Sequence, residues 1–154
     1  MSKPAILLVC LGNICRSPMA EGAFRAAATE AGLDCTIDSC GTADYHVGKS
    51  PDPRAIAEAA QHGIDISHLA ARQLADEDFK RFDRIYAMDH QNLRDIEARR
   101  PLGSQADVAL LLDAVAGREG ASVADPYYGG EEDFEATWDD VTTAASAIVG
   151  NLQG

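Results

Sequence analysis

Near its start the chain carries an unbroken apolar run, Ala5-Ile6-Leu7-Leu8-Val9, which limits the possible folds more than any other feature of the sequence. A run without polar alternation is typical of a strand buried on both faces, as in parallel sheets covered by helices. Polar residues follow Cys10, and Ser17-Pro18 then predicts a helix with Ser17 as its N-cap and Pro18 at its first position. We therefore expect a strand, a loop and a helix in direct succession.

The rest of the chain continues this alternation. We expect further strands at 35–39, 84–88 and 108–112, and further helices from 51–53 to 63, from 89 to 99 and from about 134 to 152. The last helix has apolar residues at helical spacing and should lie flat on the sheet. The alternation predicts an α/β fold, a four-stranded parallel twisted sheet with helices on both faces, Rossmann-like. A length of 154 residues suits one domain, 1–154, with ligands expected where strands such as 5–9 end.

The string Cys10-Leu11-Gly12-Asn13-Ile14-Cys15-Arg16-Ser17 connects the first predicted strand to the first helix. Backbone N–H groups in such a loop, together with the helix N-terminus, can converge on a tetrahedral dianion, and the Arg16 guanidinium can hold two of its oxygens. Gly12 and Asn13 suit the positive φ angles of a tight cradle. Cys10 would lie in a positive field that favours the nucleophilic thiolate, and the Ser17 hydroxyl could donate to its sulfur. The spacing alone also occurs by chance, but its place between strand and helix favours a phosphate site.

Continued by Pro18-Met19-Ala20-Glu21, this string resembles the signature of the low-molecular-weight protein tyrosine phosphatase family, and the resemblance extends along nearly the whole chain. It implies the phosphotyrosine protein phosphatase I-like fold and a protein-tyrosine phosphatase without metal or other cofactor. The implied reaction hydrolyses phosphotyrosine, and small aryl phosphates, through a phosphocysteine. Cys10 would be the nucleophile and Arg16 the phosphate clamp. The implied phosphate-binding loop also contains Leu11, Gly12, Asn13, Ile14, Cys15 and Ser17.

The same resemblance assigns residues outside this loop. Asp125, in Asp125-Pro126-Tyr127-Tyr128, matches the general acid that protonates the leaving phenolate and then activates water, whereas the alternative is a simple Asp-Pro turn. Ser39 and His68 match residues that hydrogen-bond Asn13 and support the loop. The alternative for His68 is an ordinary structural histidine, so neither interpretation makes it a catalytic base.

The resemblance also suggests how the substrate is chosen and how the nucleophile is protected. Tyr45 and Tyr127 would form aromatic walls above an apolar floor of Leu11 and Ile14, and the alternative is that both tyrosines are ordinary surface aromatics. Cys15 would be the redox partner of Cys10 in a reversible disulfide, and the alternative is a buried, small apolar residue.

Three other functions remain as alternatives. Arsenate reductases of this fold use additional cysteines after about residue seventy, and this chain has none after Cys40. Protein arginine phosphatases of the same family carry threonine where Ile14 stands. A catalytically silent phosphate-binding or thiol-redox module is disfavoured by the presence of Cys10, Arg16, Ser17 and Asp125 together.

Charge and cysteine content limit the partners and the compartment. Thirteen Lys and Arg against 25 Asp and Glu give a net charge of −12, which disfavours nucleic acid and anionic membranes as partners. We expect a phosphotyrosine-containing protein as substrate and a monomer or weak homodimer. The four cysteines, among which Cys35 and Cys40 would only pack, suit a reducing cytoplasm, and no zinc pattern or membrane-length segment is present in the sequence.

Overall fold

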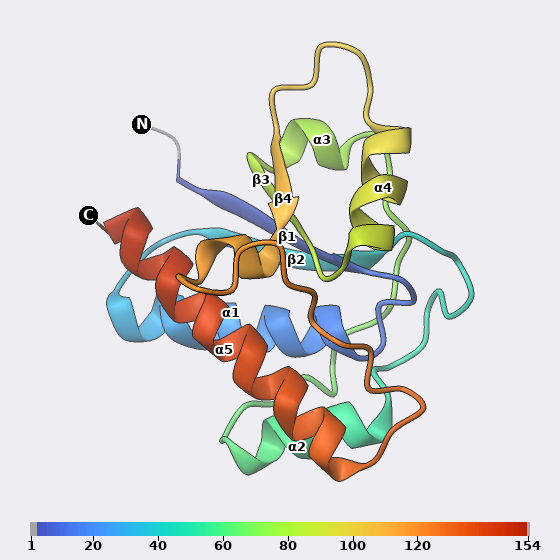
Figure 1. Ribbon diagram of the computed structural model, residues 1–154, viewed down its shortest axis with the longest axis vertical. Helices are drawn as coiled ribbons and strands as arrows, with labels where there is room; N and C mark the ends of the chain where they lie inside the picture. The colour runs from blue at the N-terminus through green and yellow to red at the C-terminus, as the bar shows by residue number, and fades with distance from the viewer. Residues whose placement is uncertain (1–2, 154) are drawn as a thin grey trace.

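The computed structural model describes residues 3–153, which form a four-stranded sheet flanked by helices (Figure 1). The sheet has the order β2-β1-β3-β4 and all its pairings are parallel, with Ile6 opposite both Ile37 and Arg84. The predicted four-stranded parallel α/β sheet is confirmed. The strands are β1 (Ala5–Cys10), β2 (Thr36–Gly41), β3 (Arg84–Ala87) and β4 (Asp107–Leu110).

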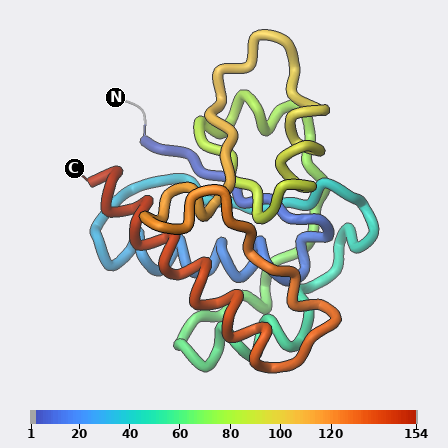
Figure 2. Tube along the Cα trace, in the orientation of Figure 1, coloured from blue at the N-terminus to red at the C-terminus, as the bar shows by residue number. Residues whose placement is uncertain are grey.

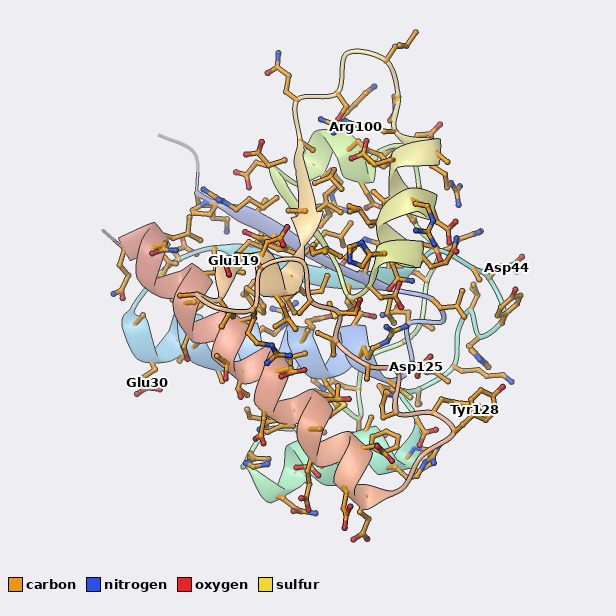
Figure 3. All side chains as sticks on the ribbon, in the orientation of Figure 1. Glu30, Asp44, Arg100, Glu119, Asp125 and Tyr128 are labelled. Carbon is orange, nitrogen blue, oxygen red and sulfur yellow. The ribbon has the colours of Figure 1, made fainter. Side chains whose placement is uncertain are left out.

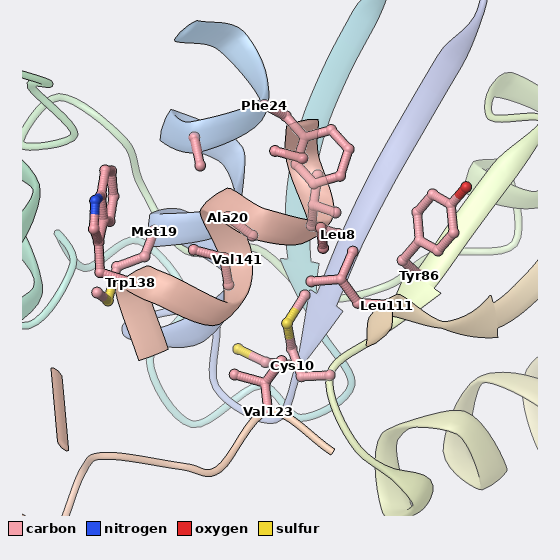
Figure 4. Close-up of a cluster of buried hydrophobic side chains, with 14 of the residues drawn as sticks. Leu8, Cys10, Met19, Ala20, Phe24, Tyr86, Leu111, Val123, Trp138 and Val141 are labelled. Carbon is pink, nitrogen blue, oxygen red and sulfur yellow. The ribbon is translucent and has the colours of Figure 1, made fainter. Parts of the chain in front are cut away.

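Helices cover both faces of the sheet. Successive side chains of a strand point to opposite sides, so each face of the sheet packs against its own helices. The helices are α1 (Arg16–Ala31), α2 (Pro53–Gln61), α3 (Asp78–Arg81), α4 (His90–Arg99), the 3-10 helix η1 (Leu111–Ala114) and α5 (Glu131–Gln153). Ile6 and Leu8 of β1 share a core with α1 and α5, part of which is drawn in Figure 4. Leu7 and Val9 point to the other side and share a second core with α3 and α4.

Two of the helix starts depend on capping carboxylates. The Asp52 side chain accepts a hydrogen bond from the Arg54 N–H, with Pro53 at the first helical position, inside the predicted start of 51–53. Asp89 caps α4 in the same manner by accepting from the Asn92 N–H. The prediction of Ser17 as the N-cap of α1 is wrong, since this helix begins at Arg16 and Ser17 is buried in its first turn.

Two predictions about the other elements need correction, and one helix was not predicted. The strand expected to reach residue 112 ends at Leu110, where the backbone tightens into η1. The unpredicted helix is α3, which has only four residues and is too short to produce a periodic sequence pattern. Helix α5 was expected to lie flat on the sheet, but its main neighbour is α1, and it also packs against α2 and η1.

The connections bring three distant segments to the carboxyl end of β1. Cys10 ends this strand, and Met88 and Asp89 follow the neighbouring strand β3. The chain after η1 then returns to the same edge (Figure 2), where the Val123 N–H donates to the Met88 carbonyl at 2.8 Å. Within residues 3–153, no helix is long and apolar enough to cross a membrane.

Candidate active site

The loop of residues 10–16, called the Cys10 loop below, turns back on itself between β1 and α1. The Asn13 N–H points inward and donates to Cys10 Sγ at 3.3 Å. Asn13 has a φ of 58°, and it is the one non-glycine residue in the described part of the chain with positive φ. Gly12 was expected to share this conformation but does not, and its lack of a side chain instead leaves room for His46, whose ring carbon would lie 2.9 Å from a Cβ.

The end of strand β2 and the two residues after it support the Cys10 loop through close backbone contacts. The Thr42 N–H donates to the Cys10 carbonyl at 2.9 Å, and the Ala43 N–H donates to the Leu11 carbonyl at 3.0 Å. A Cβ at Gly41 would lie 2.7 Å from the Leu11 carbonyl oxygen, so only glycine permits this approach.

Cys10 is buried and lies among hydrogen-bond donors. Ser17 Oγ lies 3.0 Å from Cys10 Sγ and accepts a hydrogen bond of 2.7 Å from Asn13 Nδ2. Because that amide occupies a lone pair of the hydroxyl, Ser17 can donate its hydrogen to the sulfur or, over 3.4 Å, to the Cys40 carbonyl. The expected contact between Ser17 and the sulfur is therefore present, and the Asn13 N–H contacts the same sulfur.

Arg16 is buried beside Cys10 and is held by groups from two other segments. Its Nη1 donates to Asp89 Oδ2 at 2.7 Å and to the Val123 carbonyl at 3.0 Å, and its Nη2 lies 3.6 Å from Asp125 Oδ2. Burial by itself lowers the Arg16 pKa, but the charges of Cys10, Asp89 and Asp125 outweigh burial and raise it. The guanidinium thus stays charged in a fixed plane. The sequence reasoning missed Asp89, although its position directly after a strand at the sheet's carboxyl edge was a usable signal.

Asn13 is the centre of the network that holds the Cys10 loop. Its Nδ2 donates to Ser17 Oγ and, at 3.0 Å, to Ser39 Oγ, so the predicted contact with Ser39 is present. Its Oδ1 accepts from the backbone N–H of Arg72 at 3.1 Å. The predicted contact with His68 is wrong, because this side chain is exposed and no hydrogen bond joins it to Asn13 in the described structure.

Buried carboxylates fix the partners of Asn13 in turn. Ser39 Oγ donates to Glu21 at 2.7 Å. The Arg72 guanidinium bonds both oxygens of the buried Asp78, at 3.0 and 2.9 Å, and also Asp38. Burial alone lowers the Arg72 pKa, but the hydrogen bonds with Asp78 and the surrounding negative charges together outweigh burial and raise it. The loop therefore rests on two charged clusters rather than on a histidine.

A cavity of about 370 Å³ opens above Cys10 and is called the Cys10 cavity below. Asp125 reaches it from the loop of residues 124–130, called the Asp125 loop, and the Tyr127 N–H donates to Asp125 Oδ1 at 3.1 Å. Figure 3 shows Asp125 and Tyr128 on this loop, to the right of the lower part of α5. The residues lining the cavity are Cys10, Leu11, Gly12, Ile14, Cys15, Arg16, Tyr45, His46, Asp125, Tyr127 and Tyr128.

The expected walls and floor, Tyr45, Tyr127, Leu11 and Ile14, all line this cavity, whereas His46 and Tyr128 were not anticipated. Each of these two residues directly follows a predicted wall residue in the sequence, and this adjacency was a usable signal. Aromatic and aliphatic side chains leading down to a positive base suit an aryl phosphate.

The second cysteine of the loop, Cys15, is also buried. Burial, reinforced by the nearby Asp52 and Cys10, raises the pKa of the Cys15 thiol to about 12. All four cysteines are unpaired. In the described part of the chain, no three His, Cys, Asp or Glu side chains are arranged to hold a metal ion.

The site combines a buried cysteine, an arginine beside it and a carboxylate on the same cavity. This combination defines a cysteine-dependent phosphatase. Residues 5–154 match the family model described as low molecular weight phosphotyrosine protein phosphatase. The chain belongs to this family.

Similar proteins support the assignment. The low molecular weight phosphotyrosine protein phosphatase of Schizosaccharomyces pombe is 51% identical over 132 residues, 84% of each chain. The protein of that name from Homo sapiens is 37% identical, covering 94% of this chain and 93% of the human one. The crystal structure of a protein tyrosine phosphatase from Entamoeba histolytica superimposes with a TM-score of 0.92 at 33% identity, covering 98% of this chain and 97% of that one. An arginine phosphatase from Drosophila is also similar, with a TM-score of 0.91 at 29% identity and coverage of 97% and 98%.

Proposed function

We propose that this protein hydrolyses phosphotyrosine in proteins, and small aryl phosphates, through a phosphocysteine formed on Cys10. The observation that carries the proposal is the convergence of Cys10, Arg16 and Asp125 on one cavity, with Asp125 Oδ2 3.6 Å from Arg16 Nη2. The nucleophile, the clamp and the acid thus line one cavity that can hold a phosphoryl group.

In the first half-reaction the Cys10 thiolate attacks phosphorus. A sulfur–phosphorus bond forms, the bond from phosphorus to the phenolic oxygen breaks, and that oxygen takes a proton from Asp125. Arg16 and the backbone N–H groups of the Cys10 loop stabilise the equatorial oxygens in the transition state. The products are tyrosine and phosphocysteine.

In the second half-reaction the ionised Asp125 removes a proton from water. The water oxygen attacks phosphorus, and the phosphorus–sulfur bond breaks to return the Cys10 thiolate and inorganic phosphate. The Ser17 hydroxyl, 3.0 Å from the sulfur, stabilises the departing anion. One carboxyl group therefore serves as acid and then as base.

Selection of tyrosine rests on the depth and lining of the Cys10 cavity. A phosphoserine side chain is shorter than a phosphotyrosine, so its phosphate cannot reach a buried sulfur while its backbone stays outside. Tyr45 and Tyr127 can flank the substrate ring, with Leu11 and Ile14 beneath it. Ile14 is bulky and apolar, and it favours an aryl group over the polar guanidinium of phosphoarginine.

Two assays test this function. The reduced protein should hydrolyse p-nitrophenyl phosphate at mildly acidic pH without added metal, vanadate should inhibit the reaction, and Cys10→Ser should abolish it. Phosphotyrosine peptides should be cleaved in preference to phosphoarginine peptides. An inactive reduced protein would refute the phosphatase assignment, and a preference for phosphoarginine would refute the substrate class.

The reaction also suggests the partner and the compartment. Binding of a phosphotyrosine protein follows from the substrate, and an Asp125→Ala variant, which retains the nucleophile but lacks the acid, should trap that protein. We place the enzyme in a reducing compartment such as the cytoplasm, supported by the four unpaired cysteines and the need for a free Cys10 thiolate.

A further inference from the structure

Arg54, at the start of α2, lies outside the residue set lining the Cys10 cavity, yet it contacts the Asp125 loop at several points. Its Nη2 donates to the Tyr127 carbonyl at 2.9 Å and its Nη1 to the Gly129 carbonyl at 3.3 Å. These two carbonyls stand two and four residues after Asp125. Within residues 3–153, no other side chain outside this loop and α5 donates a hydrogen bond to residues 125–129.

Aromatic contacts add to these hydrogen bonds. The Arg54 guanidinium carbon lies 5.6 Å from the centre of the Tyr127 ring and 4.7 Å from the centre of the Phe134 ring. Both distances are typical of a cation above an aromatic face. Phe134 is buried in the first turns of α5, directly after the loop. Arg54 therefore holds the outgoing half of the Asp125 loop, while its incoming half is held at Val123 by Met88 and Arg16.

The other end of Arg54 is tied to the Cys10 loop. Its Nε and Nη2 bond the two oxygens of Asp52 at 3.1 and 3.0 Å, and the Asp52 N–H donates to the Ile14 carbonyl at 2.8 Å. Hydrogen bonding and charge from Arg54 lower the Asp52 pKa, so the carboxylate remains ionised. A continuous chain of polar contacts thus runs from Ile14 through Asp52 and Arg54 to the Asp125 loop.

We propose that Arg54 is a positioning residue that sets the place of Asp125 relative to the sulfur of Cys10. This inference rests on the proposed function, in which Asp125 protonates the leaving group. A carboxyl group on an exposed loop must lie within hydrogen-bond reach of the phenolic oxygen, and misplacement by about 1 Å can reduce the rate on the order of 10²-fold. Only a planar fork can serve two carboxylate oxygens and two carbonyls at once, so lysine cannot replace Arg54.

The test measures how strongly the rate depends on the leaving group. For wild type, Arg54→Met and Arg54→Lys, kcat/KM is determined with aryl phosphates ranging from p-nitrophenyl phosphate to phenyl phosphate. A well-placed acid makes the rate nearly independent of the basicity of the phenol, and a misplaced acid penalises the poor leaving group most. We expect both variants to lose roughly tenfold to hundredfold with phenyl phosphate and clearly less with p-nitrophenyl phosphate. Inhibition by inorganic phosphate and thermal unfolding monitor the Cys10 loop and the fold.

Arg118 provides a matched control, because its side chain is also 44% exposed and also pairs with a carboxylate, that of Asp140. Arg118→Met should keep the wild-type leaving-group dependence. In an Asp125→Ala background, Arg54→Met should cause no further loss with phenyl phosphate, since the group that it positions is absent.

The inference is overturned if Arg54→Met or Arg54→Lys keeps the wild-type leaving-group dependence, or if the losses from Arg54→Met and Asp125→Ala multiply. Failure of the proposed function itself looks different, because the wild-type protein would then hydrolyse none of these aryl phosphates.

Discussion

Arg16 Nη1 donates a hydrogen bond of 2.7 Å to Asp89 Oδ2, and this contact fixes the plane of a buried guanidinium at the base of the Cys10 cavity. A side chain with free rotation would lose conformational entropy on binding phosphate, whereas Arg16 has already lost it on folding. The strand β3 that precedes Asp89 therefore contributes to anion binding without lining the cavity.

Replacing Asp89 by asparagine tests this arrangement. Asparagine is as good an N-cap as aspartate, so α4 should keep its start, but the charged partner of Arg16 is lost. We expect kcat/KM for p-nitrophenyl phosphate to fall by about tenfold to hundredfold and inhibition by inorganic phosphate to weaken. Steady-state kinetics measures this effect, with circular dichroism as the folding control. If phosphate inhibited Asp89→Asn as strongly as the wild type, Arg16 would keep its orientation without Asp89.

Removal of the Asp125 carboxyl should separate catalysis from binding. Asp125→Ala should lower kcat/KM for phenyl phosphate on the order of 10²–10⁴-fold, as is typical of general acids, and leave vanadate binding nearly intact. The loss should be smaller with p-nitrophenyl phosphate, whose leaving group needs less protonation. Equal losses with both substrates would argue that Asp125 acts only through its contact with Arg16.

The network around Asn13 predicts different effects for two substitutions of this residue. Asn13→Ala removes the bonds to Ser17, Ser39 and Arg72 and forces alanine to a φ of 58°, which costs roughly 1–2 kcal/mol of folding free energy. Asn13→Gly relieves the backbone cost but not the lost bonds, so it should be more stable than Asn13→Ala and similarly impaired in turnover. Urea unfolding and p-nitrophenyl phosphate kinetics distinguish the two effects.

His68→Ala serves as the counterpart, because this side chain is exposed and no hydrogen bond joins it to Asn13 in the described structure. Its activity and stability should match those of the wild type. A large loss of activity in His68→Ala would restore the loop-support role that the sequence suggested.

The raised Cys15 pKa gives a pH-dependent prediction for the proposed redox protection. After peroxide oxidises Cys10, closure of a disulfide needs the Cys15 thiolate, whose fraction at pH 7 is about 10⁻⁵ for a pKa of about 12. Closure should therefore accelerate about tenfold for each unit of pH below 12. Activity recovered by thiol after a fixed peroxide pulse should rise from pH 6 to pH 8, and it should vanish in Cys15→Ala. Recovery that is independent of pH, or unchanged in Cys15→Ala, would exclude Cys15 as the partner.

The same raised pKa affects folding at alkaline pH. The fold stabilises the neutral Cys15 thiol, so the contribution is fully present below the ordinary thiol pKa of 9.0 and is lost as the pH rises toward about 12. Cys15→Ala should consequently lose less stability than the wild type between these pH values, as measured by urea unfolding.

Local sequence patterns were sufficient for the scaffold and for part of the site. The unbroken apolar run 5–9 predicts a strand buried on both faces, and the polar string after it predicts the Cys10 loop, because each pattern reflects chemistry within a few residues. Asp125 was found through resemblance, and the structure brings it to the same cavity.

Sequence patterns fail to predict a residue's role where its partner is distant in the chain or is a backbone group. Ser17-Pro18 has the pattern of a helix start, but the hydroxyl is drawn to the Cys10 sulfur instead. Asn13 Oδ1 pairs with the Arg72 N–H, and a backbone donor leaves no trace in residue identity. Asp89 and Arg54 act across 73 residues, to Arg16 and to Tyr127 respectively, and no local pattern encodes such separations.

The central claim is a covalent phosphocysteine on Cys10, and acid quenching during turnover tests it most directly. Asp125→Ala, in which hydrolysis of the intermediate is slowed, is mixed with a phosphotyrosine peptide, quenched within milliseconds to seconds and digested for mass spectrometry. We predict a phosphoryl group on the peptide containing Cys10, absent when Cys10→Ser is combined with Asp125→Ala. Turnover by the wild type without any phosphoryl group on Cys10, or hydrolysis that persists in Cys10→Ser, would contradict the account.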